Sequence, residues 1–251
     1  MKRTERRHLK ENELAQTIAN ARAYIETRTR QLTGFAVAIL VIVAAIGAYV
    51  IVRQRSESRG QGLLAEAMVA LNARVVPPSA QGAQGDVPAA AQMGATGTFA
   101  TEDAKLTAAL PKLRTAADAY PDSDAGITAR YHLAGALAAL GKHQEALQAF
   151  EDVTRRAGSN SLYGRMASLG KADTQARAGQ LDQAIASWKG LAAQNPAELP
   201  VDAILMELAR AYVAKGNREE ARKTFTQIVD QHPNSPYTPE ARAELESLKG
   251  A

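Results

Sequence analysis

The chain of 251 residues contains no cysteine and carries 30 Lys and Arg residues against 26 Asp and Glu residues. The absence of cysteine excludes disulfide frameworks, thiol nucleophiles and cysteine-ligated zinc. Abundant alanine and an aromatic content of 5% favour an all-α protein over a sheet protein.

The basic residues are concentrated near the N-terminus. Residues 1–60 hold 11 Lys and Arg against 5 Asp and Glu, whereas residues 101–251 hold 18 against 19. A nucleic-acid-binding domain needs a basic surface, so the near-neutral C-terminal part predicts no nucleic-acid partner. Basic residues close to an apolar segment instead contact lipid headgroups and influence membrane topology.

Residues 1–34 are predicted to form a basic amphipathic segment. Apolar residues recur there at spacings of four, three, four and seven, which places them on one face of a helix. Such a helix lies in the membrane interface or contacts a partner helix, and the residue pattern allows both. The apolar residues are Leu14, Ile18, Ala21, Ile25 and Leu32.

Residues 35–52 form a run of eighteen residues without a charge. As a helix the run would rise about 27 Å, enough to cross the hydrocarbon core of a bilayer. A buried core helix and a cleaved signal peptide are the alternatives. The charged flanks, including Arg30 and Arg53, disfavour a core helix, and the long preceding segment with the bulky end of the run disfavours cleavage. We therefore predict an uncleaved transmembrane helix.

The predicted topology is single-pass, with a cytoplasmic N-terminus. Close to the apolar run the basic residues on its two sides balance, but the whole N-terminal segment is short and strongly basic, which favours its retention in the cytoplasm. After the run, residues 53–75 are predicted to be a juxtamembrane helix. Residues 76–101 are predicted to be a flexible Ala/Gly/Pro linker, because they contain three Pro, four Gly and seven Ala with one charge.

Three glycines mark an internal repeat in residues 102–251. Gly141, Gly179 and Gly216 lie 38 and 37 residues apart, and each separates two amphipathic stretches. Aligning the segments on these glycines shows a small, a large and an aliphatic residue five, nine and twelve positions later. They are Ala146, Ala184 and Ala221, then Phe150, Trp188 and Phe225, then Val153, Leu191 and Ile228.

This pattern resembles the tetratricopeptide repeat, over residues 127–160, 165–198 and 202–235. The resemblance implies a right-handed α-solenoid in which each repeat consists of two antiparallel helices, A and B. Glycine tolerates the turn between them, and alanine allows the helices to approach closely. A degenerate B helix is predicted at residues 103–119 and a capping helix at 238–248.

The second repeat departs from the pattern in its A helix. Lys171 stands where the neighbouring repeats have Leu133 and Leu208, so the local register is less certain from the sequence.

The residues that often carry chemistry show no catalytic arrangement. His8, His132, His143 and His232 lack a metal-ligand spacing, and no glycine-rich phosphate-binding motif occurs. The serines in residues 122–124 and 158–161 are interpreted as turn residues and helix N-caps. We therefore expect no catalytic residue, no cofactor and no metal, and the chain is predicted not to be an enzyme.

The resemblance implies a concave groove, lined by A helices, that receives peptides or partner helices. Four of its residues would form an adaptable apolar strip, namely Tyr131, Met166, Leu169 and Met206. Arg177 and Arg210 would hold a carboxylate of the partner. The alternative is that these side chains contact other parts of the chain or a second copy. The predicted groove residues are Thr128, Tyr131, Met166, Leu169, Asp173, Arg177, Met206, Arg210 and Val213.

The order of segments resembles the ancillary SecYEG translocon subunit family of bacteria. That resemblance implies a protein of the bacterial inner membrane with a periplasmic repeat domain. Its partners would be translocon subunits, periplasmic chaperones or emerging polypeptides. The alternative hypothesis is an envelope-assembly or cell-division scaffold that self-associates as a homo-oligomer.

Overall fold

The computed structural model describes residues 3–76, 97–194 and 199–249, with side chains except those of residues 3–32 and 36. The chain divides into two compact units, Met1–Arg55 and Ser56–Ala251. The long helix α1 (Arg3–Leu71) contributes to both units. Each unit is considered by itself below.

The first unit contains the predicted membrane helix. Residues 35–52 are helical, and an eighteen-residue window of this segment has a mean hydropathy of 2.9 with none of it buried. Its large apolar side chains, such as Leu40 and Tyr49, are more than half exposed. The segment is therefore not packed as a core helix within the described residues. The predicted amphipathic pattern at residues 14–32 lies outside the described side chains.

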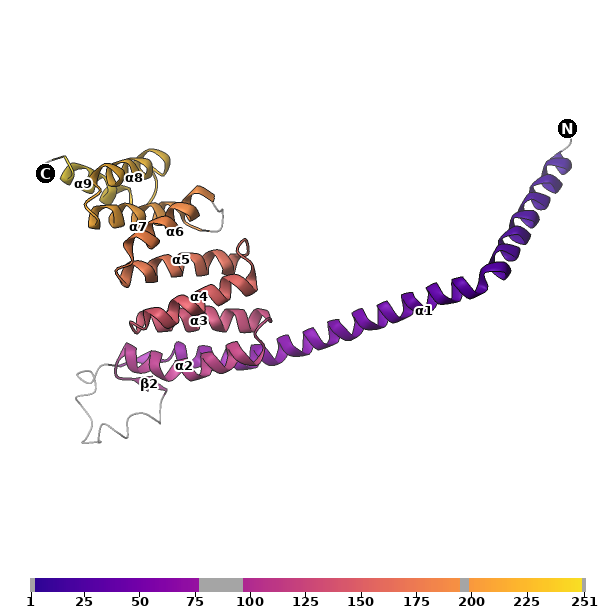
Figure 1. Cartoon of the computed structure of the whole chain (residues 1–251), viewed down its shortest axis with the longest axis horizontal. Coiled ribbons are helices and arrows are strands. Elements are labelled where there is room, and N and C mark those ends of the chain that lie inside the picture. The colour runs from indigo at the N-terminus through magenta and orange to yellow at the C-terminus, as the bar shows by residue number, and fades with distance from the viewer. Residues whose placement is uncertain (1–2, 77–96, 195–198, 250–251) are drawn as a thin grey trace. The chain divides into compact units, whose positions relative to one another are not determined.

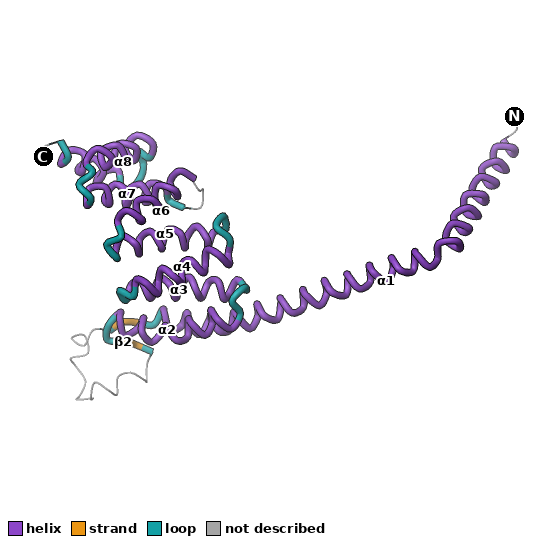
Figure 2. The backbone as a smooth tube through the Cα atoms, viewed as in Figure 1, coloured by secondary structure: helices purple, strands orange, loops and turns teal. Residues whose placement is uncertain are grey.

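The second unit is a stack of helices, each packed against the next in the chain (Figure 1). Helices account for most of its described residues, and two short strands lie near α2 (Figure 2). The predicted all-α class is confirmed. The helices that follow α1 are α2 (Glu102–Ala119), α3 (Asp124–Ala139), α4 (His143–Ala157), α5 (Leu162–Arg177), α6 (Leu181–Gln194), α7 (Val201–Ala214), α8 (Arg218–Gln231) and α9 (Thr238–Ser247).

The three repeat glycines form the turns between paired helices, as predicted. Gly141, Gly179 and Gly216 adopt φ values of 72°, 77° and 75°, which an L-residue with a side chain rarely adopts. In the first turn the Lys142 amide donates to the Leu137 carbonyl at 2.9 Å, the pattern of a Schellman C-cap. The pairs α3–α4, α5–α6 and α7–α8 are therefore A and B helices of successive repeats.

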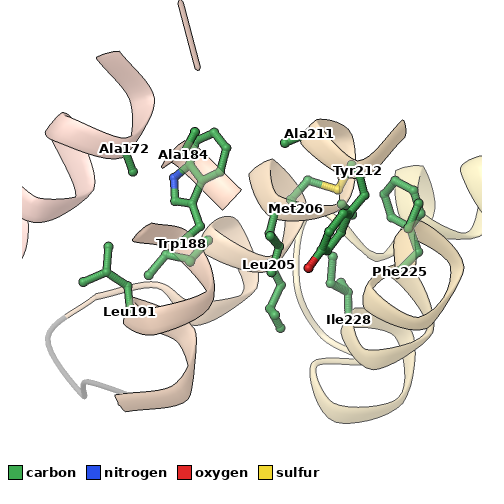
Figure 3. Packing of buried hydrophobic residues seen from close by; sticks show 14 of the residues in the cluster. Ala172, Ala184, Trp188, Leu191, Leu205, Met206, Ala211, Tyr212, Phe225 and Ile228 are labelled. Atoms are coloured by element: carbon green, nitrogen blue, oxygen red, sulfur yellow. The ribbon is translucent and has the colours of Figure 1, made fainter. Parts of the chain in front are cut away.

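The residues predicted to recur after each glycine form the core of the B helices. Ala146, Ala184 and Ala221 are fully buried, and the large residues that follow them are at most 4% exposed. Figure 3 shows Trp188 and Phe225 among the apolar side chains of the C-terminal core. Small residues let the paired helices approach, and the large ones fill the space between neighbouring pairs.

Helix α2 is the B helix of an additional pair. Ala109, Leu113 and Ala116 have the same spacing as Ala146, Phe150 and Val153 and are also fully buried. The A helix that packs against α2 is the end of α1. The residues of α1 in this core are Leu63, Leu64, Ala67, Ala70 and Leu71.

This pairing differs from the expected domain organisation. The sequence suggested a juxtamembrane helix at residues 53–75, outside the repeat domain, but residues 63–71 pack into that domain. The linker expected at residues 76–101 lies largely outside the described residues, at 77–96. Its two ends are held together by the parallel strands β1 (Arg74–Val75) and β2 (Thr98–Phe99). The described residues on both sides of that segment belong to the second unit.

A carboxylate fixes α1 against the next repeat. The Asp124 amide donates to Glu57 Oε2 at 2.9 Å, and the Ala125 amide donates to Glu57 Oε1 at 3.1 Å. Both amides lie at the N-terminus of α3, where backbone donors lack helical partners and a negative charge is favoured. Gly60 approaches the same end so closely that a Cβ atom there would lie 3.2 Å from Ser123 Oγ.

We expect Glu57→Ala to lower the free energy of unfolding by about 1–2 kcal/mol, because two helix-terminal amides lose their acceptor. Glu66→Ala is the matched control, since Glu66 forms an exposed pair with Lys112 at 3.1 Å. The control should cost less than about 1 kcal/mol. Chemical unfolding followed by circular dichroism compares the two, and equal losses would contradict the capping role.

The predicted serine N-caps are confirmed at two equivalent positions. Ser123 Oγ accepts from the Gly126 amide, and Ser161 Oγ accepts from the Gly164 amide, each at 3.0 Å. A Cβ atom on either glycine would lie 2.0 Å from a backbone carbonyl oxygen of the preceding turn. Glycine is therefore required three residues after each capping serine.

The unusual A helix of the second repeat keeps the repeat register. Lys171 is half-buried, and its Nζ pairs with Glu151 at 2.5 Å instead of entering the core. Gln175 is buried and bonds to Gln183 and Ser187 of α6, at 3.2 and 3.1 Å. Polar contacts thus replace part of the apolar packing between α5 and its neighbours.

Candidate functional site

The predicted groove residues all lie on A helices. Thr128 and Tyr131 come from α3, Met166 to Arg177 from α5, and Met206 to Val213 from α7. We call the solvent-accessible members, with the side chains that contact them, the A-helix face. Thr128 is half-buried, and its Oγ1 donates to the Asp124 carbonyl at 2.7 Å, so it contributes little free hydrogen-bonding capacity.

An aromatic cluster forms one end of the A-helix face. The ring of Tyr131 lies edge-on to Tyr163 at 5.8 Å and to Phe150 at 6.0 Å, measured between ring centroids. Such arrangements are favoured by the ring quadrupoles. Burial, and then the negative charge of Asp173, raises the pKa of Tyr131. Tyr131 therefore remains a neutral phenol beside an acidic group.

The expected apolar strip is only partly accessible. Met166 and Leu169 are half-buried and pack on the C-terminal core, and Val213 is 38% exposed. Met206, however, is fully buried, together with Ile204. Figure 3 shows Met206 between core side chains, so it supports the face from behind and offers no contact surface. The alignment of the repeats could not show that Met206, on the predicted groove side of α7, is buried.

Asp173 is a carboxylate of the face whose pKa is raised above its ordinary value. It is half-buried, and Trp188 Nε1 donates to its Oδ1 at 3.1 Å. Burial raises the pKa of the Asp173 carboxyl; the Trp188 bond opposes this effect, Glu207 adds to it, and Arg177 opposes it. These influences place Arg177 and Glu207 in the electrostatic surroundings of Asp173.

Arg210 is already engaged by acidic side chains of its own chain. Its Nη1 donates to Glu207 Oε1 at 2.6 Å, and its Nη2 donates to Glu240 Oε1 at 2.5 Å. Two internal carboxylates thus already pair with the Arg210 guanidinium, which the sequence prediction of a partner carboxylate at this residue did not include. Arg177 is exposed at the end of α5.

Glu207, Glu240, Trp188 and Tyr163 belong to the site but were not among the predicted residues. The three-residue spacing of Glu207 and Arg210 on one helix was the available signal for one pair. Glu240 is 30 residues from Arg210, and nothing in a single sequence links them. Within the part of the chain that the structure describes, no group of three His, Asp or Glu side chains could hold a metal ion.

The stability difference between Asp173→Asn and the native chain should depend on pH. The native carboxyl has a pKa above its ordinary value of 3.8, so the folded state binds the proton more tightly than the unfolded state. The native chain therefore loses stability as pH rises through the folded-state pKa, whereas the asparagine variant does not. Asparagine can still accept the Trp188 bond.

We expect the asparagine variant to gain in melting temperature relative to the native chain at neutral pH. This gain should shrink as pH falls below the folded-state pKa towards 3.8. Thermal melts at a series of pH values measure the difference. A difference that is constant over the whole range would show that the Asp173 carboxyl is not perturbed by folding.

Comparison with known proteins identifies the repeat. Residues 102–161 match one family model and residues 175–245 match another, and both are described as tetratricopeptide repeat. Together the matches cover more than half of the chain, so the protein belongs to the tetratricopeptide repeat family. Neither model is that of a catalytic family, and tetratricopeptide repeats act as scaffolds for protein–protein interaction.

One solved structure supports the same fold, and a second is also similar to this chain. The nearly identical TPR-like repeats of a Podosopora anserina protein assigned as a kinesin light chain are 21% identical, with a TM-score of 0.51. That match covers 59% of this chain and 79% of the other. A tetratricopeptide repeat protein from Parabacteroides merdae is 19% identical with a TM-score of 0.49, covering 59% and 56%. These identities bear on the fold alone. No curated protein sequence matches the chain.

Proposed function

We propose that the protein is a membrane-anchored scaffold that binds partner proteins through the A-helix face. The observation that carries this proposal is the combination of surfaces on that face. Exposed Val213, half-buried Leu169 and Tyr131, and the charged groups around Asp173 lie on consecutive A helices. A mixed apolar and ionic surface on rigid helices suits the recognition of a protein segment.

Anchoring is supported by the exposed apolar helix. Eighteen residues of high hydropathy without buried side chains need an apolar environment, which a bilayer supplies. A cleaved signal peptide is the other segment with this composition. The length of the basic segment before residue 35 and the bulky residues at the end of the run favour an anchor.

The proposed location is the bacterial inner membrane, with a cytoplasmic N-terminus and the repeats in the periplasm. The basic N-terminal segment supports this orientation. The resemblance to ancillary SecYEG translocon subunits suggests translocon subunits, periplasmic chaperones or emerging polypeptides as partners. The alternative is an envelope-assembly or cell-division scaffold that self-associates. Sedimentation of the full chain in detergent separates them, since the alternative requires an oligomer.

A fusion of alkaline phosphatase to the C-terminus tests the orientation in cells. The enzyme is active only outside the cytoplasm, so the proposal predicts activity in membranes that resist carbonate extraction. An inactive fusion reverses the topology and excludes periplasmic partners. Activity released by carbonate would instead indicate a cleaved signal peptide.

Co-purification from detergent-solubilised membranes tests the binding face. Val213→Glu places a charge on the accessible part of the A-helix face, and Thr226→Glu places the same charge at an exposed position of α8, a B helix. Quantitative mass spectrometry should show partners of the native chain retained by Thr226→Glu and lost from Val213→Glu. Loss from both variants, or from neither, would contradict binding through the A-helix face.

A further inference from the structure

The charged part of the A-helix face carries more acidic than basic groups. Asp173, Glu207 and Glu240 come from α5, α7 and α9, and the only guanidinium groups among the contacts described above are those of Arg177 and Arg210. Arg210 is shared by two of the carboxylates, at 2.6 and 2.5 Å. The five charged groups named here thus comprise three carboxylates and two guanidiniums.

The two glutamates remain accessible although they pair with Arg210. The side chains of Glu207 and Glu240 are 44% and 45% exposed. An incoming carboxylate would have to displace both from the guanidinium and would meet their charges. An incoming cation would approach the same groups without breaking either pair. The charges of the face thus disfavour acidic side chains of a partner and favour basic ones.

Asp173 offers a particularly favourable contact for a cation. Its carboxylate is half-buried and has one described donor, Trp188 Nε1. A carboxylate removed from water is stabilised by an opposite charge more strongly than an exposed one, because the local dielectric constant is lower. The neighbouring Glu207 strengthens the negative potential at this point.

The neutral part of the face suits the stem of a basic side chain. Tyr131, whose ring lies edge-on to that of Tyr163, is close enough to Asp173 for its charge to raise the Tyr131 pKa, and half-buried Leu169 lies on the same helix as that carboxylate. Lysine and arginine bury their methylene groups against apolar surface while the charged head reaches a polar partner. Aromatic faces add a cation–π attraction.

We propose that the A-helix face receives a partner protein segment bearing Lys or Arg side chains, which pair with Asp173, Glu207 and Glu240. This rests on the proposed function of the face and specifies the chemistry of its partner. It also reverses the sign expected from the sequence, where two arginines suggested a partner carboxylate. Of the two arginines, Arg210 is shared by two carboxylates of the chain.

Three fluorescent peptides provide the probe. They share an alanine, leucine and serine frame and carry three lysines, three glutamines or three glutamates at the same positions. The full chain is held in phosphatidylcholine nanodiscs, whose lipid has no net charge, and binding is measured by fluorescence anisotropy. We expect the lysine peptide to bind about tenfold more tightly than the glutamine peptide, and the glutamate peptide to bind most weakly.

Substitutions on the face should reverse the order of the peptides. The triple variant Asp173→Asn, Glu207→Gln, Glu240→Gln keeps the shape of each side chain but leaves Arg177 and Arg210 uncompensated. It should bind the glutamate peptide more tightly than the lysine peptide. Asp230→Asn, at an exposed position of α8, is the matched control and should keep the native order of peptide affinities. Melting curves verify that each variant is folded.

Several results would overturn the inference. They are equal affinities for the three peptides, no binding of any of them, a native preference for glutamate, or an unchanged preference for lysine in the triple variant. None of these outcomes decides whether the face binds proteins at all. That question is answered separately by the co-purification of Val213→Glu, so the two proposals fail independently.

Discussion

Replacing Trp188 by alanine is expected to lower the free energy of unfolding by about 3–5 kcal/mol. Trp188 is 2% exposed and is among the largest side chains of the C-terminal core. Its removal leaves a cavity between the second and third repeats, and also takes the indole donor from Asp173. The expected loss of stability therefore has two causes. Apolar packing is lost, and the partly buried carboxylate of Asp173 loses its hydrogen-bond donor.

Trp188→Phe separates the two contributions. Phenylalanine retains most of the packing but cannot donate to Asp173, so we expect a loss of about 1–3 kcal/mol. Urea unfolding of the full chain in detergent, followed by circular dichroism at 222 nm, measures both variants. An alanine variant that loses less than about 1 kcal/mol would show that this core is not closely packed.

Arg130→Ala is expected to cost about 3 kcal/mol. The guanidinium of Arg130 pairs with Asp152 of α4 at 2.8 Å and with Asp118 of α2 at 2.7 Å, and its side chain is 14% exposed. It joins three consecutive helices, and its charge and that of Asp152 are largely removed from water, whereas Asp118 is 59% exposed. Loss of one member of such a network leaves the others uncompensated. This cost lies at the lower end of the range for breaking a buried ion pair, because Arg156 still contacts Asp152 at 3.1 Å.

Two further variants test the electrostatic origin of that cost. Arg155→Ala removes a side chain that pairs with the same Asp152 but is 74% exposed, and it should cost less than about 1 kcal/mol. Arg130→Met combined with Asp152→Leu removes both charges and should recover most of the loss. If the double variant is as unstable as Arg130→Ala, packing of the arginine stem, and not its charge, holds the helices together.

The repeats could be predicted because their determinants are local. A turn with positive φ selects glycine, and the close approach of paired helices selects alanine at Ala146, Ala184 and Ala221. These requirements recur at a fixed spacing, so one sequence contains three independent instances of each. The N-cap serines were predictable for the same reason, since Ser123 and Ser161 act on amides three residues away.

The departures from prediction come from contacts that no local pattern encodes. The insertion at residues 77–96 is closed by two-residue strands, which are too short to give a strand signal. Glu57 reaches amides 67 and 68 residues away. The pairing of residues 63–71 with α2 across that insertion was consequently missed, although α2 itself was expected as a B helix.

The sequence placed the predicted face residues on particular helices, but it did not show their charged partners. The repeat register placed Tyr131, Leu169, Asp173 and Val213 on the A helices, as the structure has them. Whether Arg210 has an ion-pair partner depends on residues far away in the sequence. One such partner, Glu240, belongs to the capping helix. The ion pairs of Arg210 could therefore be read only from the three-dimensional arrangement.

Site-specific photo-crosslinking in intact cells tests the central claim most directly. A photoreactive phenylalanine analogue replaces Val213 on the A-helix face or Thr226 on α8 in the full chain, and crosslinked products are compared after irradiation. The account predicts discrete protein adducts from position 213, from partners exposed to the periplasm, and none above background from position 226. Equal adducts from both positions, or adducts from position 226 alone, would contradict it.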